Sequence, residues 1–438
     1  TEVLASCAKQ CGLKTVITSR AFLEKVKLVV PGESIYLEDL VPTITGGQKF
    51  TALLASWFLP ATSLERACGS DHKSKLDDTA TIIFSSGSTG DPKGVILSHG
   101  NIAANVDQIA QIFMLDAKDR ILGILPFFHS FGFTGTLSLP AAVGMGVVYH
   151  PSPLDSRAIG ALVNKYEVTF LLATPTFLQM YTRRCSPEDF GSLQYVVAGA
   201  EKLPDRISQA FEDQFGLRPL EGYGCTECAP VVSVNRRDFR AASFRQVGAK
   251  RGSIGHPLPG ITVKIIDVET NEPSAFGQPG LLYVKGPNVM QGYLGRPEKT
   301  AEVLKDGWYN TGDIAVLDED GFIRITDRLS RFSKIGGEMV PHIRVEDKLH
   351  EVTGSTEQVF VVTGVPDEKK GERLFVLYTL PEDKIKECVE KLTASDLPAL
   401  WKPKADQFAR VEVLPYLGTG KLDLRKIKEV AQSLAGVK

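Results

Sequence analysis

Short apolar runs of strand type alternate with helical patterns through the first half of the chain. The strand-like runs are residues 121–125, 146–149, 168–172 and 195–198. The clearest helical pattern follows Ser98, a residue type that caps helices, and repeats with a period of about 3.6 residues. Its apolar positions are Ile102, Val106, Ile109, Ala110 and Phe113. This alternation is typical of an α/β domain with largely parallel sheets.

The pattern differs on either side of this region. Residues 1–60 mix short apolar strands, such as 15–18, with helical patches. The closely spaced strands of residues 261–285 predict a smaller β-rich subdomain within the same lobe.

A second change follows the strand-like run 322–326, where a basic stretch with glycines precedes a compact segment with its own strands and helices. We therefore expect a large N-terminal lobe of residues 1–327, a hinge at 328–330 and a small, mobile α+β C-terminal domain of residues 331–438. Because ligand pockets favour domain interfaces, the site is expected in the cleft between the two lobes.

Composition narrows the class of protein. The 438 residues are 43% hydrophobic and 23% charged, which is ordinary for a globular enzyme and excludes disordered and fibrous proteins. A formal net charge of −2 argues against a nucleic-acid binder held by bulk electrostatics. Seven scattered cysteines form no disulfide framework, and Cys225 and Cys228 lack the further ligands of a zinc site. A reducing cytoplasm is expected.

Residues 121–149 carry no charged side chain over a length that could cross a bilayer. Pro126, His129 and Pro140 interrupt this stretch, so we expect a buried strand and helix there and no membrane span. The chain opens on Thr1 and shows no signal peptide, and we expect it to be a fragment of a longer protein.

Residues 84–94 read FSSGSTGDPKG, a loop with many hydroxyls and little side-chain bulk. It follows a short β-prone apolar run, residues 81–84, that we expect to be a buried strand. Glycines let the backbone N–H groups approach a ligand, hydroxyls donate hydrogen bonds, and a lysine adds positive charge. The residues that predict a polyphosphate site, and hence ATP, are Ser85, Ser86, Gly87, Ser88, Thr89, Gly90, Lys93 and Gly94. The order of glycine, lysine and hydroxyl residues is not that of a Walker A loop, which disfavours a P-loop kinase or GTPase.

With later motifs in the same order, this loop resembles the phosphate-binding signature of the adenylate-forming superfamily of acyl-CoA synthetases, firefly luciferase and nonribosomal peptide synthetase adenylation domains. The string Pro-Phe-Phe-His-Ser-Phe-Gly, residues 126–132, resembles the segment that lines the carboxylate pocket in that superfamily. The resemblance implies that His129 lies beside the acyl carboxylate, with Phe131 and Phe133 on its apolar side. An isolated match of this kind is about as often a core histidine.

Three further strings resemble the superfamily's nucleotide segments. Gly222-Tyr223-Gly224-Cys225-Thr226-Glu227 implies stacking of adenine on Tyr223, an α-phosphate contact from Thr226 and Mg²⁺ binding by Glu227. Gly199, Ala200 and Glu201 resemble the turn whose backbone flanks adenine. Asp313, in Trp-Tyr-Asn-Thr-Gly-Asp, resembles the aspartate that accepts both ribose hydroxyls, joined there by Arg328.

The C-terminal string Leu-Gly-Thr-Gly-Lys, residues 417–421, resembles the loop whose lysine bridges the acyl carboxylate and the α-phosphate. Lys421 is therefore the candidate main catalyst of adenylation. In the superfamily the small lobe rotates between the two half-reactions about a charged hinge residue, and Ser330 occupies that position here. Gly336 and Gly337 resemble the border of the pantetheine tunnel.

Several strings resemble more narrowly the acyl-[acyl-carrier-protein] synthetase part of bacterial bifunctional 2-acylglycerophosphoethanolamine acyltransferase/acyl-ACP synthetases. They include residues 195–203, 221–232 and 331–340. This resemblance implies that a fatty acid is loaded onto acyl carrier protein for lysophospholipid reacylation. It also implies an acyltransferase domain upstream, and a place at the cytoplasmic face of the bacterial inner membrane for the intact protein.

Two alternatives stay open. The acceptor thiol could belong to CoA. Basic residues near the tunnel mouth favour an acidic carrier-protein helix, but CoA is also anionic. These residues are Arg328, Arg331, Lys334 and Arg344. The chain could also be a non-catalytic fragment that binds nucleotide without turnover.

Overall fold

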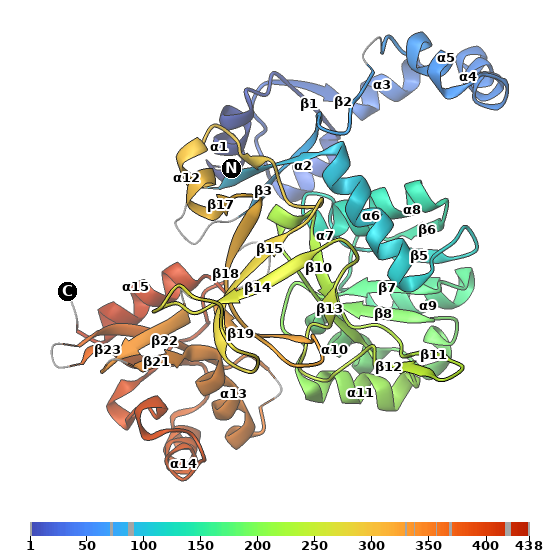
Figure 1. Cartoon of the computed structure of the whole chain (residues 1–438). Helices are drawn as coiled ribbons and strands as arrows, with labels where there is room; N and C mark the ends of the chain where they lie inside the picture. Colours follow the sequence, from blue (N-terminus) through green and yellow to red (C-terminus); the bar gives the residue numbers. More distant parts are fainter. Residues whose placement is uncertain are drawn as a thin grey trace.

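The computed structural model describes residues 2–70, 73–85, 92–328, 331–336, 338–355, 357–367, 370–416 and 422–436. These residues form a mixed α/β structure with a large N-terminal part and a smaller C-terminal part (Figure 1). The fold class expected from the sequence is confirmed.

A seven-stranded sheet with the order β13-β10-β9-β8-β7-β5-β6 forms the centre of the large part. Its five strands from β9 to β6 run parallel, whereas β10 and β13 are antiparallel additions. The strands are β5 (Arg120–Gly123), β6 (Gly146–Tyr149), β7 (Phe170–Ala173), β8 (Tyr195–Ala198), β9 (Leu220–Gly224), β10 (Val231–Val234) and β13 (His256–Pro257).

Helices cover both faces of this sheet. Successive residues of β7, such as Phe170 and Leu171, belong to different hydrophobic clusters, as expected when both faces are buried. Helix α6 packs on one face and α9, α10 and α11 on the other. The helical segments are α6 (His99–Phe113), α7 (Ser130–Gly132), η1 (Phe133–Ser138), α8 (Leu139–Val143), α9 (Ser156–Tyr166), α10 (Pro175–Arg184), η2 (Pro187–Phe190), α11 (Asp205–Phe215) and η3 (Thr226–Cys228).

Two smaller sheets flank the central one. A five-stranded antiparallel sheet, the expected β subdomain, has the order β14-β15-β18-β17 with β19 beside β18, and a three-stranded sheet has the order β16-β4-β3. Their elements are β3 (Thr79–Ser85), β4 (Lys93–Ser98), β14 (Thr262–Ile266), β15 (Pro279–Lys285), β16 (Gly292–Tyr293), α12 (Pro297–Val303), β17 (Leu304–Lys305), β18 (Trp308–Leu317) and β19 (Ile323–Arg328).

The C-terminal part has its own sheet, β21-β20-β23-β22 with β24 beside β23, and its own buried clusters. Its elements are β20 (Phe332–Ile335), β21 (Glu338–Pro341), α13 (His342–Thr353), β22 (Phe360–Asp367), β23 (Gly371–Tyr378), α14 (Glu382–Thr393), η5 (Ala399–Trp401), η6 (Ala405–Gln407), β24 (Phe408–Arg410) and α15 (Leu424–Leu434).

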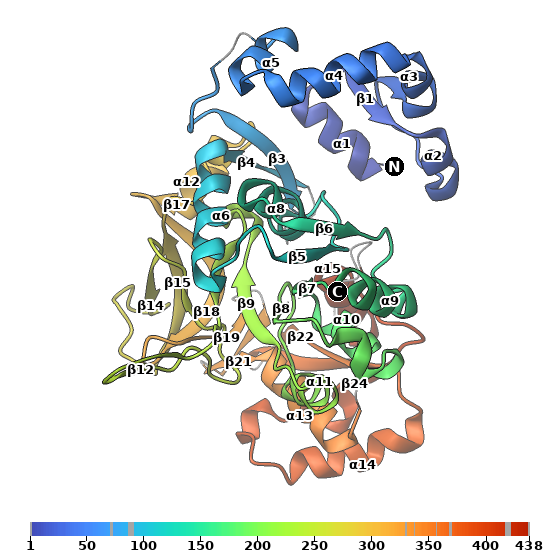
Figure 2. The same ribbon diagram turned by 90° about the vertical axis from the view of Figure 1, so that its right-hand side faces the viewer.

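The N-terminal segment carries a two-stranded parallel sheet, and helices α3 to α5 extend from the body at the top of both views (Figures 1 and 2). Helices α2 to α5 contain no buried residue. The elements are α1 (Glu2–Cys11), β1 (Thr15–Thr18), α2 (Arg20–Val26), β2 (Glu33–Tyr36), α3 (Leu37–Thr43), α4 (Gly46–Phe58) and α5 (Ala61–Ala67). A separate hairpin of β11 (Phe239–Ala241) and β12 (Phe244–Gln246) projects from the other end of the large part.

Most expected elements are confirmed within one or two residues. Helix α6 begins at His99 behind Ser98, whose hydroxyl accepts from the Asn101 N–H in a capping box. The uncharged stretch 121–149 folds as β5, a run of short helices and β6. Within the part of the chain that the structure describes, no helix combines the length and apolar character needed to cross a membrane.

One expectation about the phosphate loop is wrong in part. The run before it is not a fully buried strand, because β3 is the edge of its sheet and only Ile83 within it is buried. The chain returns as β4 antiparallel to β3, with Ser85 opposite Lys93. Ser85 and Lys93, the described residues on either side of the loop, are therefore held opposite each other.

Candidate active site

The site is built around residues 222–231, where β9 ends at one edge of the central sheet and the chain turns back into β10. A Cβ atom at Gly224 would lie 2.2 Å from the carbonyl oxygen of Pro230, so only glycine fits between the two strands. The Cys225 N–H donates to the same carbonyl at 3.0 Å and closes the turn. Thr226 and Glu227 lie at the tip of this turn.

Neighbouring elements satisfy the backbone of this turn. The Thr134 hydroxyl donates to the Ala229 carbonyl at 2.7 Å, and the Asn288 amide donates to the Cys228 carbonyl at 2.7 Å. The Asn105 side chain in α6 both donates to the Val231 carbonyl (2.8 Å) and accepts from the Val231 N–H (3.0 Å). Because Asn105 is fully buried, these bonds hold the turn against α6 with no competition from water.

Tyr293 joins the phosphate loop to the turn. Its hydroxyl donates to Glu227 Oε1 at 2.9 Å, and Lys93 Nζ lies 5.1 Å from the centre of its ring. Glu227 is 9% exposed. Burial, and next the Glu227 charge, raise the pKa of the Tyr293 phenol, which keeps it a proton donor. A lysine and a carboxylate from distant segments thus meet at one aromatic ring.

The histidine segment reaches the same turn. Ser130 and Thr226 hydroxyl oxygens lie 3.3 Å apart. His129 caps α7, since the Phe131 N–H donates to His129 Nδ1 at 3.2 Å. In the neutral imidazole this bond assigns the proton to Nε2. Phe131 is half-buried, as is Phe133.

A second cluster contains Tyr223, Asp313 and Arg328. The Tyr223 hydroxyl donates to Asp313 Oδ2, and Arg328 Nε donates to Asp313 Oδ1 at 3.1 Å. Asp313 and Arg328 are cross-strand partners on β18 and β19. Burial raises the pKa of Asp313, although the Arg328 charge acts to lower it. The Tyr223 hydroxyl has a pKa well above its usual value because of burial and then the Asp313 charge.

The turn after β8 supplies the third group. Ala200 has a φ of 70°, a left-handed conformation that is uncommon outside glycine. A Cβ atom at Gly199 would lie 3.4 Å from the Phe131 ring and 3.7 Å from the Gly222 carbonyl, so the three segments are in contact. Glu201 accepts from the Thr176 hydroxyl at 2.9 Å.

The C-terminal part faces this turn. The pKa of the Tyr416 phenol is raised by burial and then by the charge of Glu201, which lies close to it. Tyr416 forms an antiparallel bridge with Leu422, and these two residues flank the segment 417–421. At the same interface Lys202 pairs with Asp347 at 2.6 Å, and an Arg206 guanidinium nitrogen donates to the Ser355 carbonyl at 2.8 Å.

The structure therefore brings together the described residues that the motifs singled out, from Ser85 and Lys93 through His129 to Arg328. The remaining ones lie outside the described residues: Ser86, Gly87, Ser88, Thr89, Gly90, Ser330, Gly337 and Lys421. Gly336 follows β20, with a φ of 58°.

Sequence reasoning missed the residues that hold the site together: Asn105, Ser130, Thr134, Asn288 and Tyr293. One signal was available for Asn105. It lies three residues after Ile102, on the predicted apolar face of α6, and a polar residue on a buried face needs a specific partner.

The chain resembles known proteins over most of its length. Residues 1–294 match the family described as "AMP-binding enzyme". A long-chain-fatty-acid–CoA ligase of Bacillus subtilis (strain 168) is 35% identical over 361 residues, which are 80% of this chain and 62% of that protein. A feruloyl-CoA synthase of Amycolatopsis sp. is 35% identical over 352 residues, or 79% of this chain and 69% of that protein. The chain thus spans about three fifths of the length of the fatty-acid ligase.

Solved structures share the fold. ATP-bound MatB from Rhodopseudomonas palustris superposes with a TM-score of 0.79 at 23% identity, over 99% of this chain and 82% of that one. The o-succinylbenzoate coenzyme A synthetase (MenE) of Bacillus subtilis, in complex with ATP and magnesium ion, gives 0.75 at 24% identity, over 97% and 81%.

Proposed function

Because the chain belongs to the AMP-binding enzyme family, we propose that it activates a carboxylic acid with ATP, forming an acyl-adenylate and releasing pyrophosphate. The observation that carries this proposal is the meeting of Lys93, Tyr293 and Glu227 at the turn that also carries Thr226. Such a set offers positive charge, a hard oxygen ligand and a hydrogen-bond donor around one aromatic ring, as polyphosphate chemistry requires.

The roles we propose for the nucleotide site follow the two clusters. Asp313, held by Tyr223 and Arg328, is suited to accept the ribose hydroxyls, and Gly199 to Glu201 flank the adenine. The Tyr223 hydroxyl is already bonded to Asp313, so its ring is oriented before any stacking. Arg328 adds positive charge at the ribose edge.

Magnesium fits the residues present. Glu227 has a buried carboxylate that accepts a hydrogen bond from the Tyr293 hydroxyl. The Met290 N–H donates to the backbone carbonyl of Glu227 at 2.8 Å and fixes the main chain there. When bound, Mg²⁺ would neutralise phosphate charge during attack at the α-phosphate. The protein's own part is to fix the Glu227 carboxylate and to bring Lys93 to the same place.

The acid and the acceptor complete the proposal. We propose a fatty acid as substrate, held near His129, and acyl carrier protein as acceptor, on the narrower resemblance of residues 195–203, 221–232 and 331–340. In the intact protein the product would feed lysophospholipid reacylation by an upstream acyltransferase domain, at the cytoplasmic face of the inner membrane. CoA is the second candidate acceptor, favoured by the CoA ligases among the relatives.

Fatty-acid-dependent exchange of labelled pyrophosphate into ATP tests the first half-reaction. We expect exchange with long-chain acids and none without acid. No exchange here, together with exchange by a longer form of the protein, would mean that this chain is a non-catalytic fragment. The acceptor can be identified by adding carrier protein or CoA to an active reaction. Mass spectrometry then shows which of the two is acylated.

Lys421→Ala tests the proposed adenylation catalyst. We expect acid-dependent exchange to fall by about 10²–10³-fold, as for loss of one charge-stabilising group. Thioester formation from supplied acyl-adenylate should change little. Lys426→Ala, on the exposed surface of α15, is the matched control. Equal loss in both half-reactions would contradict the role.

A further inference from the structure

The hairpin of β11 and β12 carries a strong positive charge that the candidate active site does not use. Residues 236–251, here called the basic ribbon, contain six arginines and lysines and one acidic residue, Asp238, in a chain of net charge −2. All six residues of the two strands are exposed.

The base of the ribbon is bound to the body. Arg237 donates to the Gln194 carbonyl and lies 4.3 Å from the Tyr195 ring centre, and Arg251 pairs with Glu212 at 2.8 Å. These contacts fix the ribbon and satisfy its basal charges. The tip has different surroundings.

At the tip, Arg240 and Arg245 are direct cross-strand partners. Like charges opposite one another in an antiparallel pair cost stability. Asp238 offsets part of this cost, since it pairs with Arg245 at 3.0 Å and its pKa is lowered, first by the Gly248 N–H and then by Arg245. One carboxylate cannot neutralise both guanidinium groups.

The opposite face of the ribbon is apolar. Phe239 and Phe244 are 54% and 56% exposed, with ring centres 6.1 Å apart. Because side chains alternate along a strand, these rings and the two arginines lie on different faces. A ribbon with paired aromatics on one face and paired arginines on the other fits a partner that is both anionic and apolar.

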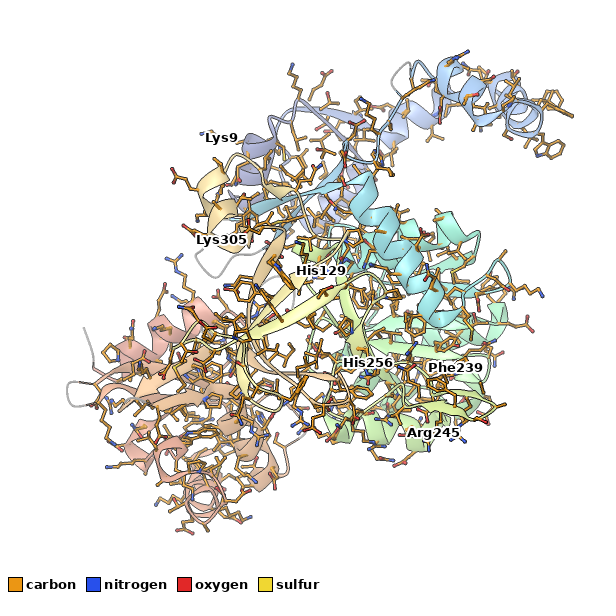
Figure 3. All side chains as sticks on the ribbon, in the orientation of Figure 1. Lys9, His129, Phe239, Arg245, His256 and Lys305 are labelled. Atoms are coloured by element: carbon orange, nitrogen blue, oxygen red, sulfur yellow. The ribbon has the colours of Figure 1, made fainter. Side chains whose placement is uncertain are left out.

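The position of the ribbon separates it from the site. Strand β10 starts beside the 222–231 turn and runs antiparallel to β9, so the ribbon that follows β10 lies toward the other end of the central sheet. Figure 3 shows Phe239 and Arg245 far from His129. A carrier protein docked on the ribbon would hold its thiol away from the site.

We propose that the basic ribbon is a contact surface for anionic phospholipid bilayers. Arg240 and Arg245 bind lipid phosphates, and Phe239 and Phe244 enter the boundary between headgroups and acyl chains. Charge and apolar burial together are the two signals that stable attachment to a membrane surface needs. This proposal is independent of the one made for the active site.

Co-sedimentation of the whole chain with vesicles tests it. We expect binding to phosphatidylcholine vesicles that contain phosphatidylglycerol, weaker binding to pure phosphatidylcholine, and a steep fall with added salt. Arg240→Gln with Arg245→Gln should weaken binding to the anionic vesicles about 30-fold. Phe239→Ser with Phe244→Ser should weaken it at every salt concentration.

Lys384→Gln with Lys386→Gln, exposed on α14, removes the same charge and should change binding less than about 3-fold. Unchanged vesicle binding by the arginine variant overturns the proposal. In that case another surface, such as the exposed Trp57 and Phe58 of α4, would attach the chain to the membrane. The proposal is also overturned if the arginine variant loses binding to an acidic carrier protein but still binds the vesicles. Unchanged thermal unfolding and pyrophosphate exchange without vesicles would show that the variants fold.

Discussion

At the scale of single residues, Tyr293 explains why the charges of the candidate site coexist. It donates to Glu227 and offers its ring face to Lys93, so one side chain stabilises both an anion and a cation. Cys225 and Cys228 flank Glu227, and the hydrogen bond between their thiols, followed by burial, raises the pKa of Cys225 well above its usual value. The Cys225 thiol is therefore in its neutral form.

Glu227→Gln removes the proposed metal ligand and keeps the size of the side chain. We expect acid-dependent pyrophosphate exchange to fall by about 10²–10³-fold and to need more Mg²⁺. Glu390→Gln, exposed on α14 and away from the site, is the matched control; a change below about 3-fold is expected there. Full activity of Glu227→Gln at low Mg²⁺ would exclude the assignment.

Glu221 gives a prediction about pH and stability. Burial raises its pKa to about 7, above the unfolded value. Between these two pKa values the folded state keeps a proton on Glu221 that the unfolded chain has lost, and this proton stabilises the fold. The stabilisation is complete below about pH 4.3 and disappears as the pH rises through 7. Glu221→Gln keeps an acceptor for the Leu203 N–H and should remove about 3 kcal/mol of this pH-dependent change.

Urea unfolding at pH 5 and pH 8 checks this prediction. The wild-type chain should lose more stability over that interval than Glu221→Gln. Glu298→Gln, an exposed change on α12, should follow the wild type. Parallel pH profiles for all three proteins would show that Glu221 has an ordinary pKa.

At the scale of elements, α6 does more than cover the central sheet. Its apolar face packs into the core, and the same face carries Asn101, Asn105 and Gln108, which donate to backbone carbonyls 186, 126 and 151 residues away. The capping box at Ser98 fixes where this helix begins, directly after β4 and Lys93. Helix α6 thus links strand β4, which carries Lys93, to the 222–231 turn.

Asn105→Ala should test this link. It leaves the part-buried Val231 N–H without its acceptor, whereas the Val231 carbonyl keeps the Asn288 amide at 3.2 Å. We expect a cost of about 1–3 kcal/mol in unfolding free energy. We also expect slower pyrophosphate exchange, because the turn loses a support. The control is Asn164→Ala in α9, which removes a single hydrogen bond to the Glu188 carbonyl of η2. It should cost less than about 1 kcal/mol in unfolding free energy. Equal thermal unfolding midpoints for the two variants would contradict the link.

At the scale of the molecule, exposed polar contacts join the large and small parts near Glu201. Lys202 and Asp347 are about half exposed, and exposed ion pairs contribute about 0–1 kcal/mol. Contacts of this strength suit an interface that opens and closes. We propose that the small part moves relative to the large one. The proposed limits are 1–327 for the large lobe, 328–330 for the hinge and 331–438 for the small domain.

Charge reversal tests whether this arrangement is the adenylating one. Lys202→Asp should slow pyrophosphate exchange about 2–5-fold, and adding Asp347→Lys should restore it. Thioester formation from supplied acyl-adenylate should be unaffected by either change. Failure of the double variant to recover would show that the contact does not support adenylation.

The sequence by itself determined the local features: the alternation of strands and helices, the capped start of α6 and the order of the motifs. These are encoded by neighbouring residues, through backbone preferences and periodic burial, and can be recognised without a fold. The tertiary structure decided what those residues contact. Tyr293 meets Glu227 across 66 residues, and Asn105 meets Val231 across 126, because packing of the sheets brings distant segments together. The same packing projects Arg240 and Arg245 at the end of the sheet away from the site, where we propose that they meet an anionic lipid surface.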